Sequence, residues 1–375
     1  SGEMYLEKLI VNPRHIEFQI MADGQGHVIQ LGDRDCSIQR RHQKVIEMAP
    51  AWSLPQSLRQ AICDAALKLM KNVKYLNAGT VEFLVDRDGN HYFIEMNPRI
   101  QVEHTVTEMV TSIDLVRAQI LIAEGQPISH PEIGLGDQNN LKVNGYAIQC
   151  RVTTEDPANN FAPDNGKIEA YRSGGGFGVR LDAATAGVGS EISPYYDSLL
   201  LKVTTWDNTF QGVCLKAGRA IREIHIRGVK TNIAFISNIL QNPTFLAGGC
   251  HTKFIDETPE LFEFTESRDR ATRVLKYIAN IQVNNPDAER HQYDTPRFPK
   301  AQREITKQDG LKLLLDTDGP EAVKDWVLGQ KKLLITDTTM RDAHQSLLST
   351  RLRTRDMLKG ADGTADILAE FDAAK

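Results

Sequence analysis

Two glutamates in the stretch AGTVEFLVDRDGNHYFIEMN, residues 78–97, are spaced so that a β-hairpin would bring them face to face. Asp88 and Gly89 separate two β-rich runs, which is a strong hairpin signal. If these two residues alone form the loop, Glu82 lies directly opposite Glu95. Facing Cβ atoms are about 4.5–5.5 Å apart, where like charges repel. A divalent cation such as Mg²⁺, which prefers oxygen ligands, would relieve that repulsion.

Asn97 follows Glu95 by two positions and therefore shares its face of the strand. Its amide oxygen would be a third ligand for the cation. Two other interpretations stay open. Each glutamate could pair with its own Lys or Arg, or a bulge could shift the register.

Polar residues follow at once in NPRIQVEH, residues 97–104. Arg99 offers a planar fork of donors that matches a carboxylate-shaped oxyanion. Gln101 is a neutral donor, and Glu103 is a candidate base. If the segment stays extended, these three side chains lie on one side of it. The alternative is a polar loop leaving a sheet, but the adjoining acidic pair favours an anion site beside a metal.

The elements that must position these residues are hairpins with few helices. Residues 15–31 alternate in polarity around an internal DG turn, and residues 53–71 have helical spacing. Residues 113–123 predict a second helix, with Ser112 as its N-cap and Gly125 as its stop.

The second half predicts short strands and glycine turns over residues 144–205, then helical spacing in residues 211–224 and 230–240. Residues 284–310 are rich in proline and charge and predict a linker. Residues 320–330 predict another helix. The expected fold class is α+β.

The bulk composition is that of an ordinary globular protein. The 375 residues are enough for two or three domains, and 41% are hydrophobic and 25% charged. A net charge of −5 and a pI near 6.1 argue against a nucleic-acid-binding surface. No apolar run or signal peptide indicates a membrane or secreted protein. Five widely spaced cysteines without a Cys-x-x-Cys pair favour a reducing, cytoplasmic setting over disulfides or zinc.

Longer motifs carry a family resemblance. IEMNPRIQVEHTVTE and RDCSIQRRHQKVIEMAP closely resemble the biotin carboxylase component of biotin-dependent carboxylases, which belong to the ATP-grasp superfamily. GVKTNIAF, FIDETPELF and LLITDTTMRDAHQSLLSTRLRTRDM resemble the pyruvate carboxylase family in particular. The resemblance covers residues 4–357. It implies ATP-dependent carboxylation of biotin by bicarbonate through carboxyphosphate, followed by conversion of pyruvate to oxaloacetate.

The resemblance implies roles for residues that match the family's motifs. Glu82, Glu95 and Asn97 correspond to the ligands of Mg²⁺ or Mn²⁺. The residues that correspond to the bicarbonate site, with Glu103 as the base, are Arg99, Gln101, Val102 (through its backbone), Glu103 and Lys44. Arg180, which closes GGFGVR, corresponds to the arginine that stabilises the biotin enolate.

The family's nucleotide contacts match a further set of positions. These are Glu7, Lys8, His15, Gln39, His42, Glu82 and Glu95. Without the resemblance, the basic run at residues 40–44 would more often be a solvated face. SGGGFG lacks the Gly-Lys-Ser/Thr of a phosphate loop, so we interpret it as a backbone turn that leads to Arg180.

The expected domains follow the family order. They are a partial ATP-grasp domain (residues 1–125, the C-terminal subdomain), a biotin carboxylase C-terminal domain (126–258), a central linker (259–332), the start of a (β/α)₈ barrel (333–358) and an unassigned tail (359–375). In the barrel, Asp342 would bind a second divalent metal, and Arg341 and Gln345 would hold pyruvate. A barrel needs about 250 residues, so here it is only begun.

Other family parts are expected to be missing from this sequence. The N-terminal domain and nucleotide lid would precede the segment that matches Met4, and no biotin-acceptor sequence occurs. We therefore expect an incomplete carboxylase that alone hydrolyses ATP poorly or not at all. Biotin would arrive on a carrier domain outside the chain.

Partners implied by the resemblance are ATP, bicarbonate, biotin, pyruvate and further copies of the chain, as a tetramer in the family. Arg270 is a candidate contact for an acetyl-CoA effector, although a helix-surface salt bridge explains it equally well. The expected location is cytoplasmic, or the mitochondrial matrix in a eukaryote. The alternatives are the biotin carboxylase subunit of an acyl-CoA carboxylase and a catalytically silent oligomerisation or regulatory module.

Overall fold

The computed structural model describes residues 4, 8–136, 138–184, 186–193, 195, 197–264 and 311–331, together with isolated positions beyond 264. The chain forms two compact units, residues 1–194 with 198–264 and residues 195–197 with 265–375. Within the described ranges no helix combines the length and apolar character that crossing a bilayer requires.

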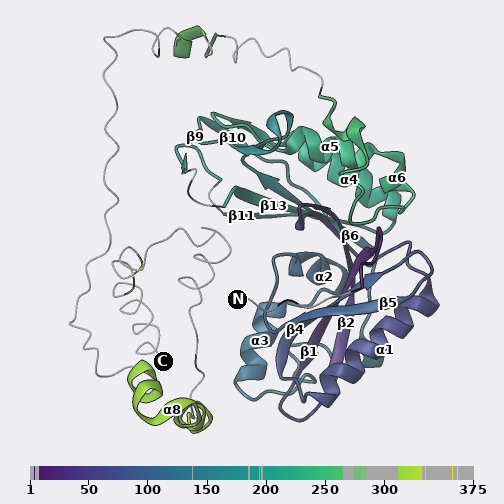
Figure 1. Ribbon diagram of the computed structural model, residues 1–375, viewed down its shortest axis with the longest axis vertical. Coiled ribbons are helices and arrows are strands. Elements are labelled where there is room, and N and C mark those ends of the chain that lie inside the picture. The colour runs from purple at the N-terminus through teal and green to yellow at the C-terminus, as the bar shows by residue number, and fades with distance from the viewer. Residues whose placement is uncertain are drawn as a thin grey trace. The chain divides into compact units, whose positions relative to one another are not determined.

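One eight-stranded antiparallel sheet runs through the first unit in the order β11-β13-β6-β3-β2-β1-β4-β5 (Figure 1). Its strands are β1 (Arg14–Ala22), β2 (Val28–Arg40), β3 (Gln43–Ala49), β4 (Asn77–Val85), β5 (His91–Asn97), β6 (Tyr146–Thr153), β11 (Val179–Ala183) and β13 (Leu199–Asp207). Three short pairs complete the strands: β7 (Glu155–Asp156) with β8 (Ala162–Pro163), β9 (Gly166–Lys167) with β12 (Glu191–Ile192), and β10 (Ala170–Arg172) with β14 (His225–Arg227).

The helices of the same unit are α1 (Gln56–Asn72), α2 (His104–Thr111), α3 (Leu115–Ala123), α4 (Phe210–Glu223), α5 (Ile233–Gln241) and α6 (Pro243–Leu246). Short 3₁₀ turns lie at Gln138–Asn140, Pro157–Asn159 and Pro259–Phe262. This mixture of helices and antiparallel sheet confirms the α+β class.

The β4–β5 hairpin has the predicted facing pairs, although its loop differs from the prediction. Asp86 N–H donates to Asn90 O, so three residues form the loop, and Gly89 supplies the positive φ of +82° that the loop needs. A bulge between Glu82 and the next pair then restores the register, and Glu82 faces Glu95. The two-residue loop was wrong, but the predicted pairing of the glutamates is confirmed.

The two faces of β1 have opposite characters because successive side chains alternate. Ile16, Phe18 and Ile20 pack against α1 in one apolar cluster. Glu17 and Gln19 point to the other face, yet both are fully buried. This side of the sheet is therefore a polar interior, and its charges must be satisfied by other side chains.

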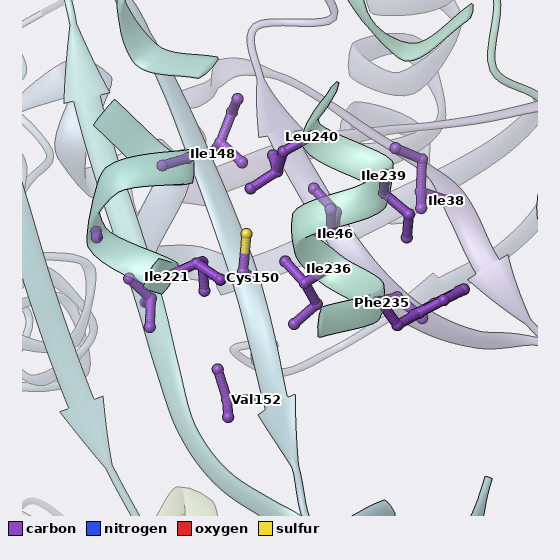
Figure 2. Close-up of a cluster of buried hydrophobic side chains, with 14 of the residues drawn as sticks. Ile38, Ile46, Ile148, Cys150, Val152, Ile221, Phe235, Ile236, Ile239 and Leu240 are labelled. Carbon is purple, nitrogen blue, oxygen red and sulfur yellow. The ribbon is translucent and has the colours of Figure 1, made fainter. Parts of the chain in front are cut away.

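A larger apolar cluster lies between the β6–β13 part of the sheet and helices α4 and α5. Figure 2 shows Cys150 and Val152 of β6 facing Ile221 of α4 and Ile236 of α5. Ile46 of β3 belongs to the same cluster. The sheet and this core continue across the expected boundary near residue 125, because β3 pairs with β6.

Three local predictions need correction. Ser112 is not the N-cap of the predicted second helix: it ends α2 with φ +59°, and the Asp114 side chain instead caps α3 by accepting from Arg117 N. Residues 99–103 are not extended, because they form a turn that leads into α2. The first hairpin turns over Asp23–His27 rather than at Asp23 and Gly24 alone.

In the second unit, helix α8 (Leu311–Leu328) has non-helical backbone at Gly319 just before Pro320. The predicted linker at 284–310 and the predicted contacts Arg270, Arg341, Asp342 and Gln345 lie outside the described residues.

Candidate functional site

A row of charged side chains crosses four adjacent strands on the polar face of the sheet. The cross-strand partners in this row are Arg34 of β2, Glu17 of β1, Glu82 of β4 and Glu95 of β5. Three carboxylates side by side repel one another unless cations or donors intervene. The arrangement around the row shows how that repulsion is relieved.

Asn97 connects the last two carboxylates. Its Nδ2 lies 2.9 Å from Glu82 Oε1 and 3.0 Å from Glu95 Oε1. The orientation of an amide follows from its hydrogen-bond partners, and a flipped Asn97 would present Oδ1 to the same point. Two carboxylates and one amide thus converge where an oxygen-seeking divalent cation fits, with Glu82 buried and Glu95 exposed.

Arg34 anchors the other end of the row. Its side chain is fully buried, and its Nε donates to Glu17 Oε1 at 2.5 Å. The remaining donors reach, within 3.0 Å, Gln19, Thr80, Gln101 and Thr107. Since Gln101 Nε2 also donates to Glu82 Oε1 at 2.7 Å, Arg34 and Glu82 hold the predicted anion-site glutamine from both sides.

Lys44 and Glu103 form the centre of the site. Lys44 Nζ pairs with Glu103 Oε1, lies 2.8 Å from Glu17 Oε2 and 3.6 Å from Glu82 Oε1. Arg151 of β6 pairs with the other oxygen of Glu103 at 3.1 Å and with Glu47 at 2.5 Å. The buried carboxylate of Glu103 therefore lies between two cations.

These contacts set the protonation states. Burial acts to raise the pKa of Glu17, but Arg34 and Lys44 outweigh it and lower the pKa to about 2. Burial also opposes ionisation of Glu82, yet the His15 hydrogen bond and Lys44 lower its pKa to about 2. Burial and Glu17 act to raise the pKa of Glu103, but Lys44, Arg151 and Arg34 lower it overall. Burial acts to lower the pKa of Lys44, but Cys36, Glu17 and Glu103 outweigh it and raise the pKa overall.

Acid is expected to destabilise the fold through Glu82. Its folded pKa of about 2 lies below the ordinary value of 4.5, so the stabilisation is complete above about pH 5.5 and is lost as the pH falls through 4.5 toward 2. Urea unfolding of the wild type and Glu82→Gln at pH 7 and pH 4 measures this. The free-energy difference between the two proteins should shrink by about 1 kcal/mol at pH 4. A difference independent of pH would contradict the assignment.

Three other predicted residues, His15, Gln39 and Val102, contact side chains around this centre. His15 Nε2 lies 2.7 Å from Glu82 Oε2, and Gln39 Nε2 lies 3.3 Å from His15 Nδ1. Val102 is exposed, and its carbonyl accepts from Lys202 Nζ at 3.1 Å.

Some predicted residues are not brought to the centre. Arg99, Lys8 and His42 are exposed and have no hydrogen bond or ion pair to Lys44 or Glu103 within the described part of the chain. Arg99 does not lie beside Gln101 and Glu103 as predicted, because the chain turns instead of continuing as a strand. Glu7 lies outside the described residues.

Arg180 enters from β11 after the glycine turn. Gly178 has φ +73°, and a Cβ there would lie 2.5 Å from Trp206 O, so the turn requires glycine. Arg180 pairs with Glu108 of α2 at 2.5 Å and with Asp182 at 2.9 Å. A cavity of about 300 Å³ lies beside Arg180, Glu108 and His104.

Several residues of the site were not predicted from the sequence. They are Glu17, Arg34, Glu47, Glu108, Arg151 and Lys202. Glu17 and Arg34 had one weak signal, since both are charged residues within β-rich runs. The others come from segments whose partners lie far away in the sequence.

Comparisons with known proteins agree with this geometry. Residues 1–131 match the family model described as carbamoyl-phosphate synthase L chain, ATP binding domain. Residues 149–257 match the biotin carboxylase C-terminal domain. The two matched segments are the two that contribute side chains to the site.

Similar sequences cover nearly all of the chain. A Staphylococcus aureus pyruvate carboxylase is 53% identical over 99% of this chain and 32% of its own length. The human mitochondrial pyruvate carboxylase is 50% identical over 96% of this chain and 31% of its own length. The chain thus spans about a third of the length of the curated relatives it matches.

Solved structures of biotin carboxylase domains and pyruvate carboxylases are also similar to this chain. The biotin carboxylase domain dimer of Hydrogenobacter thermophilus 2-oxoglutarate carboxylase, in complex with MgADP, ADP and bicarbonate, is 45% identical with a TM-score of 0.66, covering 69% of this chain and 56% of that one. A complete multifunctional pyruvate carboxylase from Rhizobium etli is 48% identical with a TM-score of 0.70, covering 94% of this chain and 33% of that one. A variant of the Rhizobium etli enzyme, with the allosteric activator acetyl coenzyme A, is 48% identical with a TM-score of 0.70 and covers 96% of this chain and 36% of that one.

Proposed function

Because the chain belongs to the pyruvate carboxylase family over the segment that it covers, we propose that its site activates bicarbonate with ATP for the carboxylation of biotin. The observation that carries the proposal is the buried carboxylate of Glu103, paired with Lys44 and Arg151 beside the Glu82–Asn97–Glu95 group. A base, two cations and a metal-binding carboxylate pair lie together there. Phosphoryl transfer needs this kind of positioning and charge neutralisation.

Each group has a role in that chemistry. Glu103 takes the proton of bicarbonate, whose oxygen then attacks the γ-phosphorus of ATP, so that ADP leaves and carboxyphosphate forms. Lys44 and Gln101 bind the anion, and Arg99 reaches it when the exposed side chain turns inward. Mg²⁺ or Mn²⁺, held by Glu82, Glu95 and Asn97, would supply positive charge to the phosphates. Carboxyphosphate then breaks down to carbon dioxide and phosphate, and the phosphate takes the ureido N–H proton of biotin. Arg180 stabilises the resulting enolate while it captures the carbon dioxide.

The adenine and ribose side involves a further group of residues. Glu7, Lys8, His15, Gln39 and His42 are proposed as nucleotide contacts. Of these, His15 contacts Glu82 directly, and Gln39 contacts His15. His42 lies in the β2–β3 turn at φ +65°, exposed to an incoming nucleotide.

We propose that the wider activity is carboxylation of pyruvate to oxaloacetate, with biotin delivered by a carrier domain. Asp342 would hold the second metal, and Arg341 and Gln345 would bind pyruvate. Similarity to pyruvate carboxylases over 95–99% of the chain favours this over the acyl-CoA carboxylase alternative. A homotetramer, acetyl-CoA control and a cytoplasmic or mitochondrial location belong to the same proposal.

Binding of MgADP tests the metal assignment. With the full-length polypeptide that carries these residues, calorimetry should show ADP binding strengthened by Mg²⁺, and Glu95→Gln should reduce that gain about 10-fold, because one anionic oxygen ligand is lost. Glu169→Gln is the matched control: this glutamate is also exposed, and it lies outside the site. An unchanged Mg²⁺ effect in Glu95→Gln would refute the assignment.

A further inference from the structure

The guanidinium of Arg180 is held by two carboxylates. Asp182, two residues along the same strand, accepts from Nε and Nη2 at 2.9 Å each. Glu108 accepts from Nη1 at 2.5 Å. Arg180 has five N–H donors, so one donor on each terminal nitrogen is left without a protein partner among the described residues. Two such donors on one plane suit a single acceptor such as a ureido or carboxylate oxygen.

Glu108 is the more firmly held of the two carboxylates. Its side chain is 11% exposed, against 28% for Asp182. Its second oxygen, Oε1, accepts from Leu115 N at 2.8 Å, where α3 begins. The first N–H groups of a helix lack partners within the helix and favour a carboxylate. Glu108 is therefore fixed at both oxygens, and its position is set by two helices.

The location of Glu108 connects the two matched segments of the chain. It lies on α2, which starts directly after the turn that holds Gln101 and Glu103. Arg180 lies on β11, in the other segment. The ion pair thus sets how far the guanidinium lies from the Glu103 centre, and both partners line the 300 Å³ cavity.

We propose that Glu108 is a positioning residue that aims the two free donors of Arg180 at the ureido oxygen of biotin. The inference rests on the proposed function and adds a residue to it. Asp182 orients the plane of the guanidinium from its own strand, whereas Glu108 fixes the far nitrogen relative to the bicarbonate-activating centre. Loss of Glu108 leaves carboxyphosphate formation in place and impairs the capture of carbon dioxide by biotin.

The test compares two rates in the full-length polypeptide that carries these residues: bicarbonate-dependent ATP cleavage without biotin, and carboxylation of free biotin. Glu108→Gln keeps the size of the side chain and an oxygen for Leu115 N, but removes the charge that pairs with Arg180. We expect biotin carboxylation to fall at least 10-fold while ATP cleavage stays within about 3-fold. Asp182→Asn should shift the same ratio in the same direction.

Arg117→Gln is the control for damage to α3, because its side chain is 57% exposed and pairs with Glu132. It should leave both rates unchanged. If the wild type is active, equal losses of both rates in Glu108→Gln, or no loss in either, would overturn the positioning role. If the wild type lacks both activities, the proposed function fails, and this inference fails with it.

Discussion

Replacing Glu103 with glutamine is expected to lower bicarbonate-dependent ATP cleavage 10²- to 10⁴-fold, the range typical of a lost general base. The amide keeps the shape of the side chain but cannot accept the proton of bicarbonate. Lys44 and Arg151 would keep their charge beside it, so anion binding should persist. Steady-state ATP cleavage and carboxylation of free biotin in the full-length polypeptide measure the effect.

The control for this substitution is nucleotide affinity. Glu103 makes no described contact with Glu95 or Asn97 of the proposed metal site, so MgADP should bind Glu103→Gln as it binds the wild type. Equal turnover in the two proteins would remove Glu103 from catalysis. Nucleotide binding without turnover even in the wild type would favour a silent module.

Replacing Arg34 with methionine is expected to cost about 3–5 kcal/mol of unfolding free energy, because it leaves the buried charge of Glu17 without its main partner. The guanidinium is completely buried and bonded to five side chains. Gln19 and Gln101 would also lose a donor, and each unsatisfied buried group adds to the loss. Urea denaturation of the chain measures it.

A double variant separates the charge from the packing. Arg34→Met combined with Glu17→Gln should recover part of the lost stability, since the uncompensated charge is gone. Arg117→Gln, at an exposed ion pair, should change the unfolding free energy by less than about 1 kcal/mol. If Arg34→Met lowered the unfolding free energy by no more than Arg117→Gln does, the role of Arg34 as the anchor of the site would be contradicted.

The sequence predicted the β4–β5 part of the site because the information is local. A hairpin brings together residues about a dozen positions apart, so Glu82 and Glu95 meet whatever the rest of the chain does. Even so, two errors cancelled: the loop has three residues, and the bulge moves the register back. Turn chemistry in the sequence did not reveal that bulge.

The rest of the site depends on pairing between distant strands. Glu17 meets Glu82 across 65 positions, and no local signal fixes that register. Arg151 and Arg180 come from the second matched segment, and their contacts with Glu103 and Glu108 exist only after the sheet has formed. The extended conformation assumed for residues 99–103 was wrong because α2 begins immediately afterwards, and this start needs a turn.

The β3–β6 pairing has a consequence for how this protein can be divided. Sequence comparison separates the chain into two modules near residues 131 and 149, but their strands share one ladder, with Ile46 opposite Cys150 and Glu47 opposite Gln149. A cut between them would leave the fully buried Glu47 on a bare strand edge, open to pairing with another chain. The two modules are therefore one folding unit, and we expect neither to keep its native sheet when it is produced without the other.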